Sequence, residues 1–299
     1  MAPTTKAPPM IDYTVVSAHR DLLGEVPIWC ERTASLWWID VLRSALHHLD
    51  TATGQITTAT TQGGRIGSIA LREQGGLLVA NSEGIDFFDP GTGTQQPFAG
   101  YGRLGPAQRF NDGRVDRQGR FWVGSMHEEF LPQGTLFRVD TDGTITAIFG
   151  DIIVPNGIAF SPDSRTLYFA DTRRFSMWSF DFDAATGMIS NRTAFSDTKG
   201  KPGRPDGSAV DSEGFIWNAE YAGGQIVRYA PNGRIDRTID LPMSHPTSLC
   251  FGGPDLQTLF ITSGSYTLSP DALAAEPLAG AVIAIHAGVK GLPEPRFGG

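Results

Sequence analysis

The stretch Leu36-Trp37-Trp38-Ile39 combines aromatic and branched apolar residues, and similar runs recur along the whole chain. The centres of these runs are six large residues, namely Trp38, Leu78, Trp122, Tyr168, Trp217 and Phe260. Successive centres lie 40, 44, 46, 49 and 43 residues apart. Short strands repeated at this interval are typical of the blades of a β-propeller. The spacing therefore predicts six blades, which fill nearly all of the 299 residues.

The residues between these runs also indicate an all-β protein. The central runs are followed by second apolar runs such as 136–139, and hairpin pairs stand at Asp142-Gly143 and Asn232-Gly233. No stretch shows sustained helical periodicity, and the best helical candidate is the short segment 270–275. We predict a single six-bladed β-propeller domain over residues 10–299, preceded by a disordered lead at residues 1–9.

A propeller needs its last blade to be closed. The run Tyr13-Thr14-Val15-Val16 precedes the first blade and has no partner within it. We expect this run to become the outer strand of the sixth blade, because pairing there would cover an open sheet edge.

Composition excludes several classes of function. The net charge is −8 and the pI is about 5.2, without a run of Lys or Arg, which argues against a nucleic-acid partner. No apolar stretch approaches 18 residues, so no membrane span is expected. The N-terminus lacks the pattern of a secretory signal, from which we expect a cytoplasmic protein. The sequence leaves the oligomeric state open.

The two cysteines, Cys30 and Cys250, both fall in predicted inner strands. We expect two buried free thiols, because free cysteine is among the most buried residue types. A disulfide stays open as an alternative if blades one and six bring the two residues together. Their spacing matches no zinc or redox motif.

Polar residues recur at the mouth of the predicted inner strands. Counted to the centre of the next strand, the offset is 13 residues for Glu25 and Arg65, 12 for Asn156, and 11 for Asn111 and Asp206. Taken singly, Asn156-Gly157 and Asp206-Gly207 resemble ordinary hairpin turns, and Glu25 resembles a surface carboxylate. At the same phase of a ring they converge on one axis. Glu25, Asn156 and Asp206 would then form an all-oxygen set that suits a hard divalent cation in a central metal-binding channel.

Several of these motifs resemble the gluconolactonase/regucalcin (senescence marker protein) family. The resemblance runs from about residue 13 to 290, and its motifs occur in the family's order. They are Gly24-Glu25-Val26-Pro27-Ile28-Trp29, Arg109-Phe110-Asn111-Asp112-Gly113, Pro155-Asn156-Gly157-Ile158-Ala159-Phe160-Ser161-Pro162-Asp163, Ala170-Asp171-Thr172, Arg204-Pro205-Asp206-Gly207, and Phe251-Gly252-Gly253-Pro254-Asp255 with Leu259-Phe260-Ile261-Thr262. The resemblance implies a six-bladed propeller that holds one divalent cation and acts on lactones of sugar acids.

Carried over residue by residue, the resemblance assigns roles to the mouth residues. Glu25, Asn156 and Asp206 match the family's metal ligands, and Asp206 also matches its proposed general base. The substrate-binding candidates are Arg109, Asn111 and Glu129. Two positions depart from the family pattern, because Val26 stands where Gly is usual and Cys30 where a polar residue is more frequent.

Two histidines are left with open roles. His127 could line the substrate pocket beside Glu129, or it could serve a structural hydrogen bond. His245 precedes the sixth inner strand and could reach the channel.

The leading hypothesis is a lactonase in which a bound cation polarises the lactone carbonyl and activates water. The cation could be Ca²⁺, Zn²⁺, Mn²⁺ or Mg²⁺, and the partner would be a small sugar lactone. No Gly-x-Ser-x-Gly motif indicates a serine hydrolase. Two alternatives stay open: a related propeller hydrolase acting on esters or phosphotriesters, and a non-catalytic calcium-binding propeller.

Overall fold

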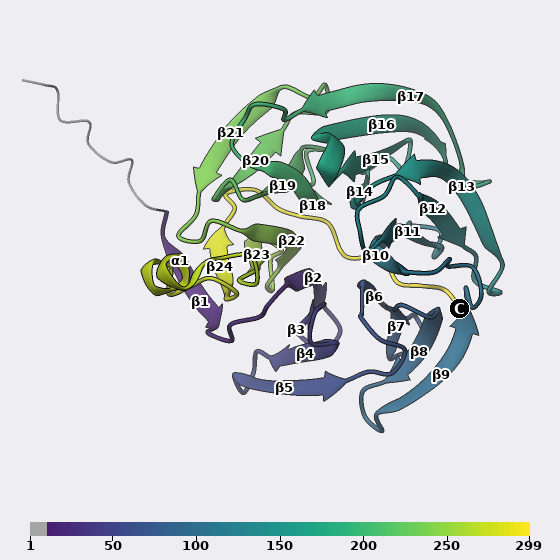
Figure 1. Ribbon diagram of the computed structural model, residues 1–299, viewed down its shortest axis with the longest axis horizontal. Helices are drawn as coiled ribbons and strands as arrows, with labels where there is room; N and C mark the ends of the chain where they lie inside the picture. The colour runs from purple at the N-terminus through teal and green to yellow at the C-terminus, as the bar shows by residue number, and fades with distance from the viewer. Residues whose placement is uncertain (1–10) are drawn as a thin grey trace, which may run out of the picture.

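The computed structural model describes residues 11–299, which form six four-stranded antiparallel sheets arranged as blades around a central axis (Figure 1). The predicted fold class is thereby confirmed. The lead expected at residues 1–9 lies outside the described residues.

The blades are numbered in chain order, and within each blade the strands are named from the innermost outward. Blades 1 to 3 contain β2 (Gly24–Cys30), β3 (Ser35–Asp40), β4 (Ala45–Asp50) and β5 (Gln55–Thr60); β6 (Ser68–Leu71), β7 (Leu77–Ala80), β8 (Ile85–Asp89) and β9 (Thr94–Ala99); and β10 (Gln108–Val115), β11 (Phe121–His127), β12 (Gly134–Val139) and β13 (Ile145–Ile152). Blades 4 to 6 contain β14 (Pro155–Phe160), β15 (Thr166–Asp171), β16 (Ser176–Asp183) and β17 (Met188–Asp197); β18 (Arg204–Val210), β19 (Ile216–Tyr221), β20 (Gln225–Tyr229) and β21 (Ile235–Asp240); and β22 (Pro246–Gly252), β23 (Thr258–Ser263), β24 (Val282–His286) and β1 (Tyr13–Ser17).

Blade 6 is closed by the beginning of the described chain. Strand β1 pairs antiparallel with β24, with Tyr13 opposite Ile285 and Val15 opposite Ile283. The predicted closure is confirmed, and it gives the last blade the same four strands as the others.

The apolar core consists of wedges between neighbouring blades. Each of six clusters of buried residues combines side chains from two adjacent sheets. Three second-strand tryptophans are fully buried and donate their indole N–H to an aspartate, at 2.9 Å from Trp38 to Asp21, 3.0 Å from Trp122 to Asp116, and 2.9 Å from Trp217 to Asp211. The repeated large residues of the sequence are therefore core residues of these wedges.

Helical structure is confined to short pieces in the described chain. A 3₁₀ turn, η1 (Thr172–Arg174), follows β15, and α1 (Pro270–Ala275) lies where the sequence placed its best helical candidate. None of the helices in residues 11–299 is long and apolar enough to cross a membrane. Cys30 in β2 and Cys250 in β22 are buried free thiols, as expected.

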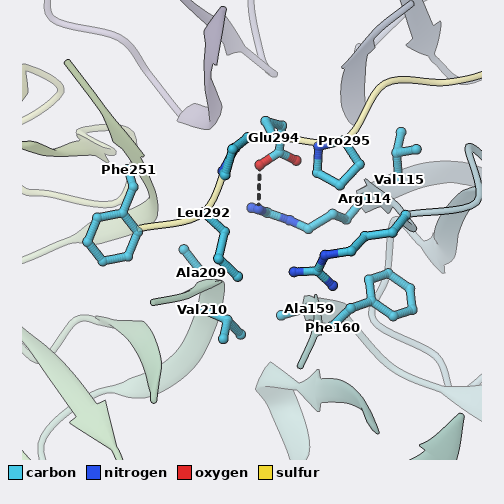
Figure 2. Close-up of a pocket in the computed structure, with 12 residues that line it drawn as sticks. Arg114, Val115, Ala159, Phe160, Ala209, Val210, Phe251, Leu292, Glu294 and Pro295 are labelled. Carbon is cyan, nitrogen blue, oxygen red and sulfur yellow. Dashed lines mark hydrogen bonds and ion pairs between the residues drawn. The ribbon is translucent and has the colours of Figure 1, made fainter. Parts of the chain in front are cut away.

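The C-terminal residues after β24 run across one end of the channel, where the yellow chain crosses the centre of the ring (Figure 1). Gly291 pairs with Asp211 of blade 5, and Phe297 pairs with Arg72 of blade 2. Between them, Glu294 accepts a hydrogen bond of 2.9 Å from Arg114 of β10 (Figure 2). This end of the channel is closed except for a cavity of about 40 Å³.

Candidate active site

The opposite end of the channel opens into a polar cavity of about 370 Å³. Its lining comes from the mouths of the inner strands and from the loops around them. Five of the predicted residues face it, namely Glu25, Arg109, Asn111, Asn156 and Asp206. A volume in this range is typical of small-molecule sites.

A β-bulge at the start of the inner strands places these side chains in the channel. The pairing register shifts between Glu25 and Ile28 in β2, and equivalent shifts occur in β10, β14, β18 and β22. A bulge bends the strand and redirects a side chain that would otherwise follow the regular alternation. The residue after the ligand position has a positive φ of 46° at Val26 and 61° at Gly157. Such a φ suits glycine and strains a β-branched residue, so Val26 departs from the family pattern at a strained position.

Among the candidate metal ligands, Asn156 and Asp206 are buried and Glu25 is half-buried, and the two carboxylates repel each other. Burial, together with the charge of Asp112, raises the pKa of Glu25. Burial and the charges of Glu25 and Asp112 also raise the pKa of Asp206. The Oδ1 atom of Asp206 is buried and has no hydrogen-bond partner among the described residues. A cation at this point would satisfy that oxygen and remove the repulsion between the carboxylates, so the donor set fits a divalent metal ion.

The amide of Asn156 is held by a chain of hydrogen bonds across three blades. Its Nδ2 donates to Thr172 Oγ1 at 2.8 Å, and Thr172 Oγ1 donates to the carbonyl of Pro205 at 2.7 Å. On the other side, Asn111 Nδ2 donates to Asn156 Oδ1 at 3.1 Å. These contacts fix the orientation of the Asn156 amide and connect it, through Thr172, to Pro205, the neighbour of Asp206.

Within residues 11–299, no group of three or more His, Cys, Asp or Glu side chains is arranged to hold a metal ion. The set at the channel mouth has a different composition, because it combines two carboxylates with an amide. Asp112 is a third carboxylate in the same region, which the sequence argument did not select. Its Oδ2 accepts the N–H of Ile158 at 3.0 Å, and burial raises its pKa to about 6.

Arg109 is fixed at the cavity wall by its neighbours. Its Nη1 donates to Asn111 Oδ1 at 2.7 Å and to the carbonyl of Phe110 at 2.9 Å. Its Nε lies 3.4 Å from Glu128 Oε1, and Glu128 also pairs with Arg65. Arg109 therefore presents a buried guanidinium to the cavity beside the candidate ligands.

The structure places Glu128 in the cavity wall in place of the predicted Glu129. Strand β11 ends at His127, so strand alternation no longer fixes where the following residues point. Glu128 turns inward to the two arginines, whereas Glu129 is exposed and does not line the cavity.

Both histidines with open roles lie outside the cavity lining. His127 is buried, and its Nδ1 accepts the backbone N–H of Glu129 at 3.1 Å, which is the structural alternative stated for it. His245 packs edge-on against Tyr221 at 4.8 Å between ring centres, and its Nδ1 is 2.6 Å from Ser244 Oγ. His245 therefore packs against Tyr221, which itself lines the cavity.

The rim of the cavity carries residues that the sequence argument did not assign to the site. They are Arg173, Arg204, Phe130, Tyr221 and Tyr266. A local signal was present for two of them, because Arg204 begins the motif of Asp206 and Arg173 directly follows Asp171-Thr172. Phe130 and Tyr266 come from loops whose course the sequence does not fix, and Tyr221 is the last residue of β19.

Fold and site together define a six-bladed propeller with a buried oxygen-donor set and a polar cavity at one end of its channel. The family model described as "SMP-30/Gluconolactonase/LRE-like region" matches residues 23–265. The chain belongs to this family, and the resemblance noted in the sequence is confirmed.

Two curated relatives match the chain over nearly its full length. A 6-deoxy-6-sulfogluconolactonase from Pseudomonas putida is 39% identical over 93% of this chain and 96% of its own length. Regucalcin from Xenopus laevis is 33% identical over 93% of this chain and 95% of its own. A crystal structure described as that of a calcium-binding protein, regucalcin, from Agrobacterium tumefaciens is 33% identical. It has a TM-score of 0.91 and covers 96% of this chain and 97% of that one. These relatives support the expectation of a lactonase.

Proposed function

We propose that the protein is a metal-dependent hydrolase that opens lactones of sugar acids. The observation that carries this proposal is the convergence of Glu25, Asn156 and Asp206 at one cavity, with a buried Asp206 oxygen that lacks a partner among residues 11–299. Buried carboxylates without a compensating charge are unfavourable, so a site that retains two of them is best explained by a bound cation.

In this proposal Glu25, Asn156 and Asp206 hold one divalent cation, with Ca²⁺, Zn²⁺, Mn²⁺ and Mg²⁺ as the candidates. When bound, the cation polarises the lactone carbonyl and lowers the pKa of water. Three protein ligands are the number found at catalytic sites that leave coordination positions free for water and substrate.

The chain's own residues supply the remaining chemistry. Asp206 takes a proton from the attacking water as the water oxygen bonds to the carbonyl carbon. The ring C–O bond then breaks as the ring oxygen takes this proton from Asp206, and the open sugar acid is released. Arg109 faces the cavity with a fixed guanidinium that stabilises the negative oxygen of the tetrahedral intermediate.

Substrate hydroxyls would be held by the polar wall. Asn111 and Glu128 line the cavity beside Arg109, and both carry oxygen atoms that accept hydrogen bonds from a sugar. A wall of this kind rejects analogues that lack the hydroxyls, because its buried polar groups would then be left unpaired. We assign to Glu128 the substrate contact that the sequence comparison gave to Glu129.

The names of the relatives support the reaction class and the metal. The Pseudomonas putida relative is a lactonase of a sugar acid, and the Agrobacterium tumefaciens structure is that of a calcium-binding protein. Both align over more than nine-tenths of this chain, which supports carrying the reaction class and the metal over to it.

The test is hydrolysis of a panel of aldonolactones by metal-stripped protein, with each of the four cations added back separately. We expect one or more lactones to open only when a cation is present. Opening at the same rate without metal would contradict the metal role. If no lactone opens under any cation, a panel of esters and phosphotriesters separates a related hydrolase from a binding protein.

A further inference from the structure

We infer that the substrate carries a negatively charged group at the end remote from the lactone carbonyl, and that Arg173 and Arg204 bind it. This inference rests on the lactonase function proposed above, and it names the substrate class for the same cavity. Its basis is the distribution of charge between the floor and the rim of the cavity.

Arg173 stands on the rim between blades 3 and 4. Its guanidinium lies 4.0 Å from the centre of the Phe130 ring, which belongs to the loop after β11. The backbone beneath it is fixed, because Asp171 accepts the N–H of Arg173 at 3.2 Å. An arginine stacked on an aromatic face keeps its N–H edge available, and that edge matches the oxygens of a carboxylate, phosphate or sulfonate.

Arg204 stands on the neighbouring part of the rim as the first residue of β18. Its guanidinium lies 5.0 Å from the centre of the Phe175 ring, at the end of η1. Like Arg173, it lines the cavity and forms no ion pair with a carboxylate in the described part of the chain. The pair therefore differs from Arg65 and Arg109, which share Glu128 as an ion-pair partner.

The charges of the cavity lining favour an anion at the rim. Four arginines face three carboxylates, Glu25, Glu128 and Asp206. A divalent cation at the floor would neutralise Glu25 and Asp206, and Glu128 neutralises one of the two arginines that it contacts, so the excess positive charge lies mainly on the two rim arginines. The whole chain has a net charge of −8 and repels anions. A basic rim at the mouth of an acidic protein attracts an anionic substrate to this one point.

The polarity of the site also fixes the orientation of the substrate. The carbonyl must reach the ligand set at the floor, where Asn156 and Asp206 are buried and Glu25 is half-buried near the start of the inner strands. The other end of the molecule then lies at the rim, beside the exposed Arg173 and the half-buried Arg204. A neutral sugar lactone would leave both guanidinium groups without a partner.

The experiment compares glucono-1,5-lactone with its 6-phosphate and 6-carboxylate counterparts. For the metal-loaded wild-type protein we expect kcat/KM to be about 10- to 100-fold higher for the charged lactones, the range set by charge-assisted hydrogen bonds. In the double variant Arg173→Gln/Arg204→Gln this ratio should fall at least 10-fold. A matched control is Arg192→Gln. It removes an arginine whose guanidinium stacks at 4.0 Å on Trp178 of β16 in blade 4, and it should leave the ratio unchanged.

Binding provides a second readout that does not depend on turnover. By calorimetry, wild-type protein should bind 6-phosphogluconate more tightly than gluconate, and the double variant should lose this difference. Equal affinity for the two in the wild type, or a difference that survives in the double variant, would overturn the inference. A protein that binds 6-phosphogluconate preferentially and opens no lactone would refute the proposed hydrolysis and retain the anion site. Whether the phosphate or the carboxylate is the better substrate identifies the anion.

Discussion

The two ends of the central channel are made by the same inner strands and have opposite properties. At the mouth, β2, β10, β14 and β18 begin with polar side chains around an open cavity, and an Asp206 oxygen lacks a partner in the described chain. At the other end these strands finish beneath residues 291–299, and Arg114 donates to Glu294 across the channel (Figure 2). Arg114 also donates to the carbonyl of Ser208.

This difference between the two channel ends indicates that the beginning of each inner strand serves function and its end serves stability. At the closed end the charge of Arg114 is paired with that of Glu294, which is how buried ions are normally tolerated. Carboxylates at the mouth face one another, and their pKa values are raised by burial and mutual repulsion. Changes at the mouth should therefore impair activity without unfolding the protein, and changes at the closed end should do the reverse.

The largest expected effect is that of Asp206→Asn. Removing the proposed base and metal ligand should lower kcat/KM by on the order of 1000-fold or more. The metal-free variant should be at least as stable as the metal-free wild type, because the change removes one of the mutually repelling buried carboxylates. Kinetics and urea unfolding on the same preparations measure both quantities. Normal turnover in the variant would refute the site.

The counterpart at the closed end is Phe297→Ala. Phe297 is fully buried, and its ring centre lies 5.5 Å from that of Phe98. Deleting such a ring should cost about 3 to 5 kcal/mol of unfolding free energy. The folded variant should keep its kcat/KM, because Phe297 does not line the mouth cavity. A large loss of turnover in fully folded protein would show that the two ends are coupled.

Much of the mouth could be predicted from the sequence, because its residues recur at one phase of the repeat. Glu25, Asn156 and Asp206 were found in this way. The spacing of the repeat predicted the blade count, and the unpaired run at 13–16 predicted the closing strand β1. What the phase could not supply is the bulge that redirects these side chains. The positive φ of Val26 is invisible in a sequence that shows only an unusual residue at that point.

Residues beyond strand ends were harder to place. The choice between Glu128 and Glu129 depends on a turn in which Phe130 has a φ of 58°, and no alternation of strand residues extends that far. Arg173 follows a strand of blade 4, and its guanidinium stacks on Phe130 in the loop after β11 of blade 3. The closed end was not anticipated at all, because residues 291–299 lie across the channel through isolated bridges and side chains without forming a strand.

A third prediction concerns the pH dependence of stability at the mouth. Glu220 of β19 is buried, accepts the hydroxyl of Tyr229 at 2.8 Å, and has its pKa raised by burial to about 7. Between the unfolded pKa of 4.5 and this value, the folded state binds more protons, so unfolding free energy falls as pH rises. The folded protein should lose up to about 3 kcal/mol from this group between pH 5 and 8.

The variant Glu220→Gln isolates this contribution, because an amide keeps the contact with Tyr229 and does not ionise. Urea unfolding of the metal-free proteins at pH 5 and pH 8 should show the variant gaining stability relative to wild type at the higher pH. The exposed Glu31→Gln serves as control and should show no such gain. If the unfolding free energies of Glu220→Gln and wild type change by the same amount between pH 5 and pH 8, the buried carboxylate is not the source of the pH dependence.

The smallest effect, and the sharpest test of the contrast between the two ends, is expected for Thr172→Val. The substitution keeps the shape of the side chain and removes the hydroxyl that joins Asn156 to the carbonyl of Pro205. Loss of an outer contact of this kind typically weakens metal binding about 10- to 100-fold. The Kd for the activating cation, measured by titration of stripped protein, should rise by that factor, and saturating cation should restore most of kcat. Thr198→Val removes another buried threonine hydroxyl, which donates to the carbonyl of Phe175, and it should leave the Kd unchanged. If both variants weaken binding alike, the effect comes from general loosening of blade 4. If only Thr172→Val does, the hydrogen-bond chain positions the ligand.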